Sequence, residues 1–277
     1  MSDKSKISWT DATWNPLYGC TKISPGCAHC YIARTPPYRM LGLRFEHGRI
    51  PIQLLPERLS QPLRWKRPRR IFVNSLSDLF HEDVPDKYIF EVFDVMDRAP
   101  QHTFQLLTKR PERMRQWVGA ARGKGWPLPN VWLGVTAENQ HWLAQRWPYL
   151  EATPAAVRFL SLEPLLGPID LCLAEMNPAK RPQWVIVGGE SGGTAGRALV
   201  EPCLEPGDHV HIDQDLNTPC TGFETKPAAL AWIRSIRDQC VVAGVPFFLK
   251  QWGGPRAKSG GWLLDGRTWD EFPEVKP

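Results

Sequence analysis

Short apolar runs bounded by polar residues recur along the chain from residue 71 to residue 251. Runs of this length are typical of buried strands, because a parallel strand that is covered on both faces needs apolar side chains on both. We interpret the following runs as strands: IFVNS (71–75), FQLLTK (104–109), VWLGVT (131–136), VRFLSL (157–162), WVIVGG (184–189) and PFFLKQ (246–251). With one strand before Cys20, the pattern predicts six or seven strands.

Segments with helical periodicity lie between these runs, at 85–99, 111–120, 139–147 and 226–243. Strands that alternate with helices predict parallel pairing through right-handed crossovers, and therefore an α/β fold. The number of strands suits a partial or complete (β/α) barrel. Residues 35–70 are less regular, and there we expect the end of a helix, a loop and a short helical segment around 56–64.

The length of 277 residues is compatible with a single domain, because α/β barrels commonly reach this size. Residues 194–225 break the alternation and are predicted to be an insertion within the last crossover. This insertion contains Cys203, His209, His211 and Cys220, residue types that can bind zinc. Neither cysteine has a close cysteine neighbour, so we favour a loop that covers a substrate or contacts a partner.

No apolar run approaches the ~20 residues that a membrane-spanning helix needs. The first residues, MSDKSKISWTD, contain no apolar signal region, so we expect a cytoplasmic protein with no membrane partner. Seven cysteines, an odd number, argue against a disulfide framework and favour metal binding together with buried thiols. Cys172 and Cys240 lie in apolar or helical contexts and are predicted to be packing thiols.

The net charge of +5 is mildly basic, and its distribution is uneven. A basic run surrounds Trp65 and precedes the strand at 71–75; its members are Arg64, Lys66, Arg67, Arg69 and Arg70. The chain also has thirteen tryptophans. Cations near aromatic rings suit nucleobases and phosphates, which predicts a nucleic-acid or nucleotide substrate. The alternative is a solvated basic loop in front of a strand.

The segment WNPLYGCTKISPGCAHCYIAR (14–34) contains three cysteines, Cys20, Cys27 and Cys30, and no other cysteine follows before Cys172. Thiolates are soft ligands, and glycine and proline between them let the backbone bend so that they converge on one metal centre. Three ligands leave one metal position open for chemistry. A zinc ion held by the same cysteines with His29 or a water molecule is the alternative.

The string CTKISPGCAHCY resembles a variant of the cluster loop of the radical S-adenosylmethionine (SAM) superfamily, in which three cysteines hold a 4Fe-4S cluster and SAM chelates the fourth iron. The usual gaps there are three residues and then two, whereas here the first gap is six, as in divergent branches. The rest of the chain resembles an often phage-encoded family assigned to that superfamily, through the strings WTDATWNP, FVNSLSDLF, LLTKRPERM, WLGVTAEN, SLEPLLGP, VIVGGESG and FFLKQWGG. The resemblance implies a barrel of the radical SAM type, a 4Fe-4S cluster, SAM and an external electron donor.

Polar residues follow each predicted strand, and in barrels the active site is built from the loops at these carboxyl ends. In radical SAM enzymes the segment after the second strand binds the methionyl amino group. Here that segment supplies Ser75, Ser77 and Asp78, and the glycine-rich turn with Gly188 and Gly189 resembles the late turn that packs near adenine or substrate. Together with Thr136 and Glu138 at another strand end, these are the candidate cofactor-binding residues. The candidate catalytic residues are Lys109, Glu163, Glu190 and Lys250, of which the lysines are candidates for the SAM carboxylate or a substrate anion.

The activity that the resemblance implies is cleavage of SAM to a 5′-deoxyadenosyl radical, which abstracts hydrogen from a nucleic-acid-related substrate. We expect a rearrangement or hypermodification of a thymine-derived base in phage DNA, a reaction of the isomerase or lyase type, with free nucleotides and peptides still open. Two alternatives remain: a zinc-binding non-radical enzyme, and a nucleic-acid-binding protein with a structural metal site.

Overall fold

The computed structural model describes residues 5–120, 125–192, 197–202, 223–256 and 258–274. The chain divides into two compact units. The first unit comprises Met1–Thr136 and Gln145–Phe159, and the second comprises Ala137–Ala144 and Leu160–Pro277. The single domain expected from the sequence stays a prediction, because the boundary between the units passes through one helix and one strand.

Seven strands form the main sheet in the order β1-β4-β5-β6-β7-β8-β11. Their bounds are β1 (Ala12–Trp14), β4 (Arg70–Val73), β5 (Thr103–Thr108), β6 (Val131–Thr136), β7 (Val157–Leu162), β8 (Trp184–Gly188) and β11 (Phe247–Gln251). The pairs β1–β4, β4–β5, β5–β6 and β8–β11 are parallel. The predicted α/β fold is therefore confirmed, and its topology is consistent with a partial (β/α) barrel.

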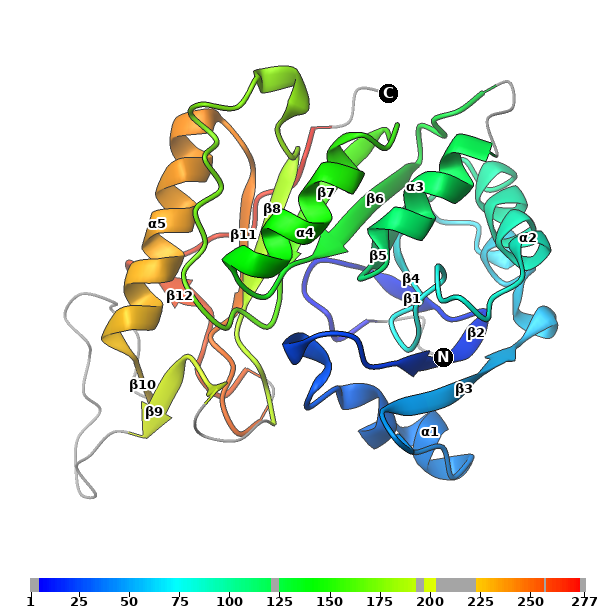
Figure 1. Ribbon diagram of the computed structural model, residues 1–277, viewed down its shortest axis with the longest axis horizontal. Coiled ribbons are helices and arrows are strands. Elements are labelled where there is room, and N and C mark those ends of the chain that lie inside the picture. The colour runs from blue at the N-terminus through cyan, green and yellow to red at the C-terminus, as the bar shows by residue number, and fades with distance from the viewer. Residues whose placement is uncertain (1–4, 121–124, 193–196, 203–222, 257, 275–277) are drawn as a thin grey trace. The chain divides into compact units, whose positions relative to one another are not determined.

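The crossovers of the first unit contain the predicted helices α2 (Asp86–Asp97) and α3 (Pro111–Ala120). Both helices bury one apolar stripe, as expected for helices that cover a sheet. The two helices lie side by side (Figure 1), and Phe93 of α2 stacks on Trp117 of α3 with ring centroids 4.5 Å apart. Helix α4 (Gln140–Glu151) follows β6 and includes Pro148.

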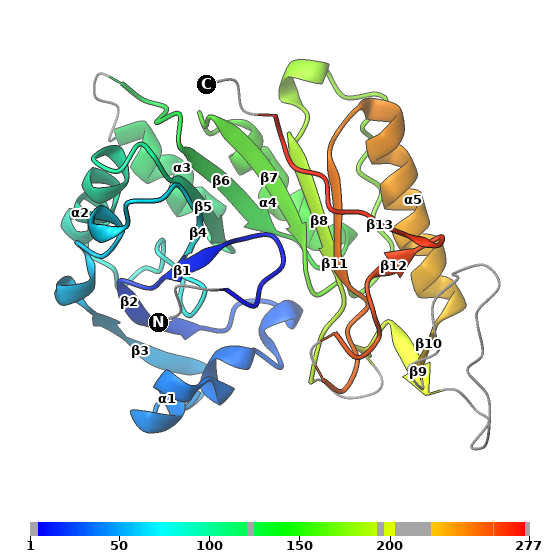
Figure 2. The same cartoon turned by 180° about the vertical axis from the view of Figure 1, so that it is seen from behind.

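The connection from β1 to β4 is more structured than the sequence pattern predicts. Strand β2 (Leu17–Thr21) pairs in antiparallel fashion with β3 (Arg49–Leu54), and Figure 2 shows both near helix α1 (Pro36–Met40). Short 3-10 turns complete the connection: η1 (Pro25–Cys27), η2 (Tyr31–Arg34), η3 (Pro56–Arg58) and η4 (Pro62–Arg64). Four buried side chains form a small core under these elements: Tyr18, Ile32, Tyr38 and Ile50. The loop expected before residue 56 therefore contains a strand, β3.

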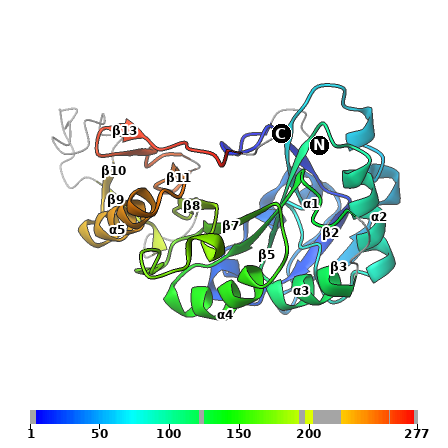
Figure 3. The same ribbon diagram turned by 90° about the horizontal axis from the view of Figure 1, so that it is seen from above.

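In the second unit, helix α5 (Pro227–Ala243) contacts β11 (Figure 3) and ends at Gly244, whose φ of +66° is the left-handed conformation of a helix cap. Strands β9 (Val200–Pro202) and β10 (Phe223–Thr225) pair in antiparallel fashion at the two ends of the predicted insertion. The remaining elements are η5 (Pro178–Lys180), β12 (Leu263–Leu264) and β13 (Arg267–Thr268).

Within the ranges given above, no helix combines the length and the apolar character that crossing a membrane requires.

Candidate functional site

The three cysteines lie beyond the carboxyl end of β1. Cys20 is part of β2, Cys27 ends the turn η1, and Cys30 directly precedes η2. All three are free thiols; Cys27 is buried, and the other two are partly buried. Gly19 lets β2 run close to β3, because a Cβ atom at this position would lie 2.2 Å from the carbonyl oxygen of Pro51. The backbone next to Cys20 therefore depends on glycine.

The charges around the thiols differ from one cysteine to the next. Burial raises the pKa of Cys20 to about 12, and the charge of Asp78 adds to this while Arg110 opposes it. Burial acts in the same direction on Cys27, but there the charge of Lys109 and hydrogen bonds to Ile23 and Ser24 outweigh it and lower the pKa. Cys27 is thus the most acidic of the three thiols.

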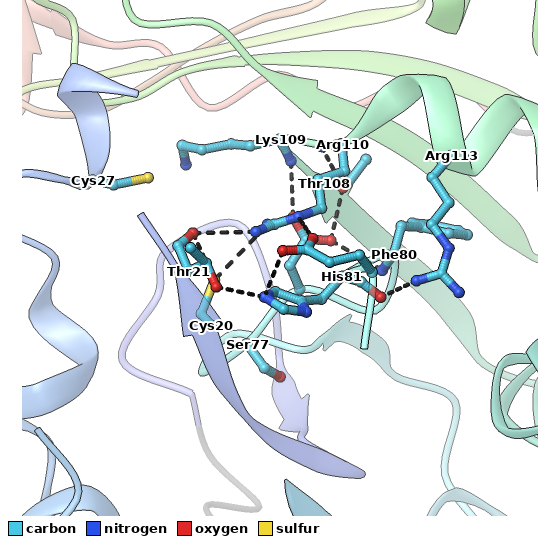
Figure 4. Close-up of polar contacts among 12 residues, drawn as sticks. Cys20, Thr21, Cys27, Ser77, Phe80, His81, Thr108, Lys109, Arg110 and Arg113 are labelled. Carbon is cyan, nitrogen blue, oxygen red and sulfur yellow. Dashed lines mark hydrogen bonds and ion pairs between the residues drawn. The ribbon is translucent and has the colours of Figure 1, made fainter. Parts of the chain in front are cut away.

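The acidity of the Cys30 thiol lies between those of Cys20 and Cys27. Burial raises its pKa, and the charges of Lys109 and Lys22 oppose that effect. The thiols of Cys20 and Cys30 each interact electrostatically with Cys27, so all three belong to one electrostatic neighbourhood. Figure 4 shows Lys109 reaching toward Cys27 and Arg110 toward Cys20.

The donor set suits an iron–sulfur cluster, because thiolates are the soft ligands that such clusters bind. The nearby cations would offset the negative charge that the thiolates carry. Among the described residues, no three His, Cys, Asp or Glu side chains are grouped closely enough to hold one. The predicted ligands Cys20, Cys27 and Cys30 are therefore neighbours that this structure does not group closely enough to hold an ion.

Asp78 links the loop after β4 to the end of β5. Its Oδ1 accepts hydrogen bonds from the backbone N–H of Phe80 (3.0 Å) and the hydroxyl of Thr108 (2.7 Å). Its Oδ2 accepts from the backbone N–H of Lys109 (3.1 Å) and from Nη1 of Arg110 (3.2 Å). These four donors occupy the carboxylate, so in this structure Asp78 holds Lys109 and Arg110, the two cations that follow β5, in position.

Arg110 continues this network from β5 to β2. Its Nε donates to Oε2 of Glu82 at 2.9 Å, and its Nη2 donates to the carbonyl oxygen of Thr21 at 3.2 Å. Its Nη1 lies 4.0 Å from Sγ of Cys20. The guanidinium is largely buried, with 10% of its side chain exposed, so its position is fixed by these partners. The sequence shows Arg110 only as a cation next to Lys109 at the end of a strand. Its partners lie 28 to 90 residues away along the chain, so the sequence pattern does not reveal them.

His81, in the loop after β4, provides a second hydrogen-bonded connection to β2. Its Nδ1 accepts a hydrogen bond from the backbone N–H of Asp83 at 3.1 Å. The hydrogen is therefore assigned to Nε2, which donates to the hydroxyl of Thr21 at 2.7 Å. Burial and the charge of Arg110 lower the pKa of His81, so the ring is neutral near neutral pH.

The two serines predicted to bind the cofactor are bonded within the protein. Ser75 Oγ lies 3.1 and 3.2 Å from the two side-chain amide atoms of Asn15. Ser77 Oγ donates to the carbonyl oxygen of Leu17 at 3.0 Å and accepts from Nδ2 of Asn74 at 2.7 Å. Both hydroxyls thus connect the loop after β4 to the segment that leads into the cysteines.

Asn74 belongs to the polar cluster that follows β4, but it is not among the predicted cofactor-binding residues. It is 3% exposed and has a φ of +61°, which is uncommon for a residue with a side chain. Its Nδ2 is committed to Ser77, whereas its buried Oδ1 has no hydrogen-bond partner in the described structure. A buried acceptor of this kind is suited to an N–H or O–H group of a ligand.

A second group of predicted residues lies in the second unit, at the carboxyl ends of β7, β8 and β11. Glu163 Oε1 and Lys250 Nζ form an ion pair at 2.9 Å, and Ser161 donates to Glu163 Oε2 at 3.3 Å. Gly188 makes room for this carboxylate, because a Cβ atom there would lie 2.5 Å from Glu163 Oε1. The structure therefore brings together Glu163, Lys250 and Gly188.

The glycine-rich turn after β8 packs against the turn after β11. A Cβ atom on Gly189 would lie 2.0 Å from the carbonyl oxygen of Trp252, and one on Gly253 would lie 2.3 Å from that of Glu190. Glu190 forms an ion pair with Arg197 at 3.3 Å, and Gln251 Nε2 donates to Ser191 at 2.6 Å. The glycines thus let two backbone segments approach each other closely.

Thr136 is the last residue of β6 and Glu138 follows this strand; they belong to different units, and both side chains are buried. The backbone oxygen of Thr136 accepts from Arg146, and that of Glu138 accepts from the N–H of Leu166. Cys240 is buried, as expected for a packing thiol, whereas Cys172 is exposed. The insertion residues Cys203, His209, His211 and Cys220 lie outside the described residues.

Comparisons with known proteins give one result. Neither the curated proteins nor the solved structures include a match to this chain. A family model described as "Protein of unknown function (DUF5131)" matches residues 4–202 and 197–273. The chain therefore belongs to the DUF5131 family.

Proposed function

We propose that this protein is a radical SAM enzyme of divergent type, with a partial barrel of the radical SAM kind. The observation that carries the proposal is the group of three free thiols beyond β1, with Lys109 and Arg110 at the end of β5 beside them. Cys20, Cys27 and Cys30 would hold three irons of a 4Fe-4S cluster and leave the fourth for SAM. When bound, the pair supplies one-electron reductive cleavage of SAM and a radical that abstracts hydrogen from the substrate.

The protein's own contribution to this chemistry is electrostatic. Ligation removes the protons of three thiols, two of which have a raised pKa, so negative charge accumulates. Lys109 and Arg110 offset this charge, and Asp78 fixes both through the backbone of Lys109 and the guanidinium of Arg110. Cys27 has the lowest pKa of the three, so it is the thiol that would lose its proton most readily.

In the second unit, Glu163 and Lys250 are the candidate groups for a charged part of SAM or of the substrate. Each charge is already balanced by the other, so a ligand with both a positive and a negative group can replace each partner in turn. A nucleic-acid-related substrate, in particular a thymine-derived base, agrees with the net charge of +5. An external electron donor is required for the reductive step.

The decisive experiment is anaerobic reconstitution with iron and sulfide, followed by dithionite and SAM, with 5′-deoxyadenosine as the measured product. We expect a brown protein with thiolate-to-iron absorption near ~400 nm. We also expect 5′-deoxyadenosine from the wild type and none from Cys27→Ala. Cys240→Ala is the matched control, because this buried cysteine lies in α5 of the second unit.

A colourless protein that retains zinc and forms no 5′-deoxyadenosine would contradict the proposal and favour a non-radical enzyme. A coloured protein that does not bind SAM would instead favour a nucleic-acid-binding protein with a structural cluster.

A further inference from the structure

The basic run and the cysteines lie at opposite ends of the same strand. The run ends at Arg70, the first residue of β4, whereas the loop after β4 reaches the cysteine-bearing β2 through Ser77. At about 3.3 Å per residue, the four residues of β4 alone separate the two ends by roughly 10 Å. Both belong to the first unit, so this separation is a property of one compact body.

The backbone of the basic run is anchored to the turn before β5. The Trp65 side chain is buried, with 9% exposed, and its carbonyl oxygen accepts a hydrogen bond from Gln101 at 3.3 Å. His102 Nε2 lies 3.1 Å from the carbonyl oxygen of Pro62, which extends the attachment to η4. Arg69 lies over the Trp65 ring at 4.9 Å. The backbone of the segment is therefore held in place, and its exposed side chains extend from this fixed backbone.

Three cations of the run point to solvent without an acidic partner. Arg64, Lys66 and Arg67 are exposed, and none forms an ion pair with any described residue. Arg70 differs, because it is paired with Asp11 at 3.3 Å. Clustered cations without counter-charges repel one another, so a surface that keeps three of them together is favoured when an anion binds there.

The buried state of Trp65 restricts what this surface can recognise. Stacking on a base requires an exposed aromatic face, and the Trp65 ring is covered. The groups on this surface that can still contact a nucleic acid are Arg and Lys side chains, which bind phosphates without recognising the base sequence. We propose that Arg64, Lys66 and Arg67 form a phosphate-binding surface that tethers a nucleic-acid strand at the amino edge of β4, away from the cysteines.

This inference rests on the nucleic-acid substrate of the proposed function, but not on its cluster. It changes the role of the basic run from presenting a base for reaction to holding the polymer nearby. Local retention of a polymer raises the effective concentration of its other segments.

The test is binding of fluorescently labelled oligonucleotides to the full-length chain without added iron, measured by anisotropy. Duplex DNA, single-stranded DNA and RNA of one sequence should all bind, because the contacts are to phosphate. Three phosphate contacts predict that duplex affinity falls roughly 40-fold between about 50 and about 200 mM salt. The variant Arg64→Gln/Lys66→Gln/Arg67→Gln should lose most of this salt dependence together with the affinity.

The matched control removes three exposed cations elsewhere on the surface that form no ion pair within the described part of the chain: Lys87→Gln/Arg115→Gln/Arg256→Gln. This variant has the same net charge as the first and should bind within about twofold of the wild type. Equal weakening of both variants would overturn the proposal, because net charge alone would then explain binding. So would a wild type that does not bind, or one that prefers polyglutamate to DNA.

A second measurement tests the position of the surface. With a short duplex at saturation, iodoacetamide should alkylate Cys20, Cys27 and Cys30 at the rate seen without DNA, as read by mass spectrometry. Backbone hydrogen exchange should slow in the segment around Trp65. Protection of the cysteines in place of this segment would overturn the tether. Production of 5′-deoxyadenosine is scored separately, so either proposal can fail while the other stands.

Discussion

The carboxyl ends of the strands are stabilised differently in the two units. In the first unit, side chains from distant segments connect the loops, with Asp78 and Arg110 at the centre (Figure 4). In the second unit, the turns after β8 and β11 are connected mainly by backbone bonds, such as Gly189 N–H to the oxygen of Gln251, and by close approach at glycines. A network of side chains can rearrange when a ligand binds, whereas interlocked backbones cannot do so without moving the strands.

This difference suits the two candidate roles. To hold the proposed cluster, the thiols of the first unit would have to come closer together, and their neighbours are side chains that can follow. Glu163 and Lys250 lie on the rigid framework of the second unit, which can present a charged pair at a fixed separation. The comparison thus predicts adaptation at one site and preorganisation at the other.

The largest effect is expected from Gly189→Ala in the second unit. The new methyl group would lie 2.0 Å from the carbonyl oxygen of Trp252, so β8 and β11 would have to separate. We expect a loss of stability on the order of 4 kcal/mol, measured by urea unfolding. The control Gly119→Ala in α3 meets no atom within 4 Å and should be neutral or stabilising. Similar stabilities for both variants would mean that the two turns are not interlocked.

A smaller effect is expected from Asp78→Asn in the first unit. Arg110 and Asp78 are both largely buried, so removal of one charge leaves the other poorly compensated. We expect a loss of about 3 kcal/mol. Glu82, the other carboxylate that contacts Arg110, is 61% exposed, and Glu82→Gln should cost less than about 1 kcal/mol. If the two substitutions cost the same in denaturant unfolding, the buried pair does not dominate this network.

The smallest effect is a pH dependence that involves His81. Its pKa is lowered in the folded protein by burial and by Arg110, so the unfolded chain binds more protons. This contribution to stability is complete above the ordinary histidine pKa of about 6.5 and is lost as the pH falls, by at most about 1.4 kcal/mol per pH unit. His102 has a pKa lowered by burial too and adds to the slope.

The measurement is the free energy of unfolding between about pH 7.5 and about pH 5, where carboxylates contribute little. The variant His81→Gln should show a shallower slope than the wild type, and His102→Gln should show the same kind of change. An unchanged slope in His81→Gln would contradict a neutral buried ring.

Patterns along the chain predicted the main strands and helices, because each of these elements buries its own apolar residues. The same reasoning missed β3, of which only Ile50 is fully buried, because pairing with β2 stabilises this strand. It selected Asp78 and Lys109 from their positions after strands, but not the role of Arg110. Local sequence does not encode contacts between residues that are 32 or 90 positions apart.

The antiparallel pairing of β9 with β10 determines how the chain tolerates changes in length. Pro202 lies opposite Phe223, so the two described residues that flank positions 203–222 are neighbours in one antiparallel pair. The entropy of closing a loop grows slowly with its length, by about 0.6 kcal/mol for each doubling. A reporter domain inserted between Pro202 and Phe223 is therefore expected to leave the fold of the described residues intact.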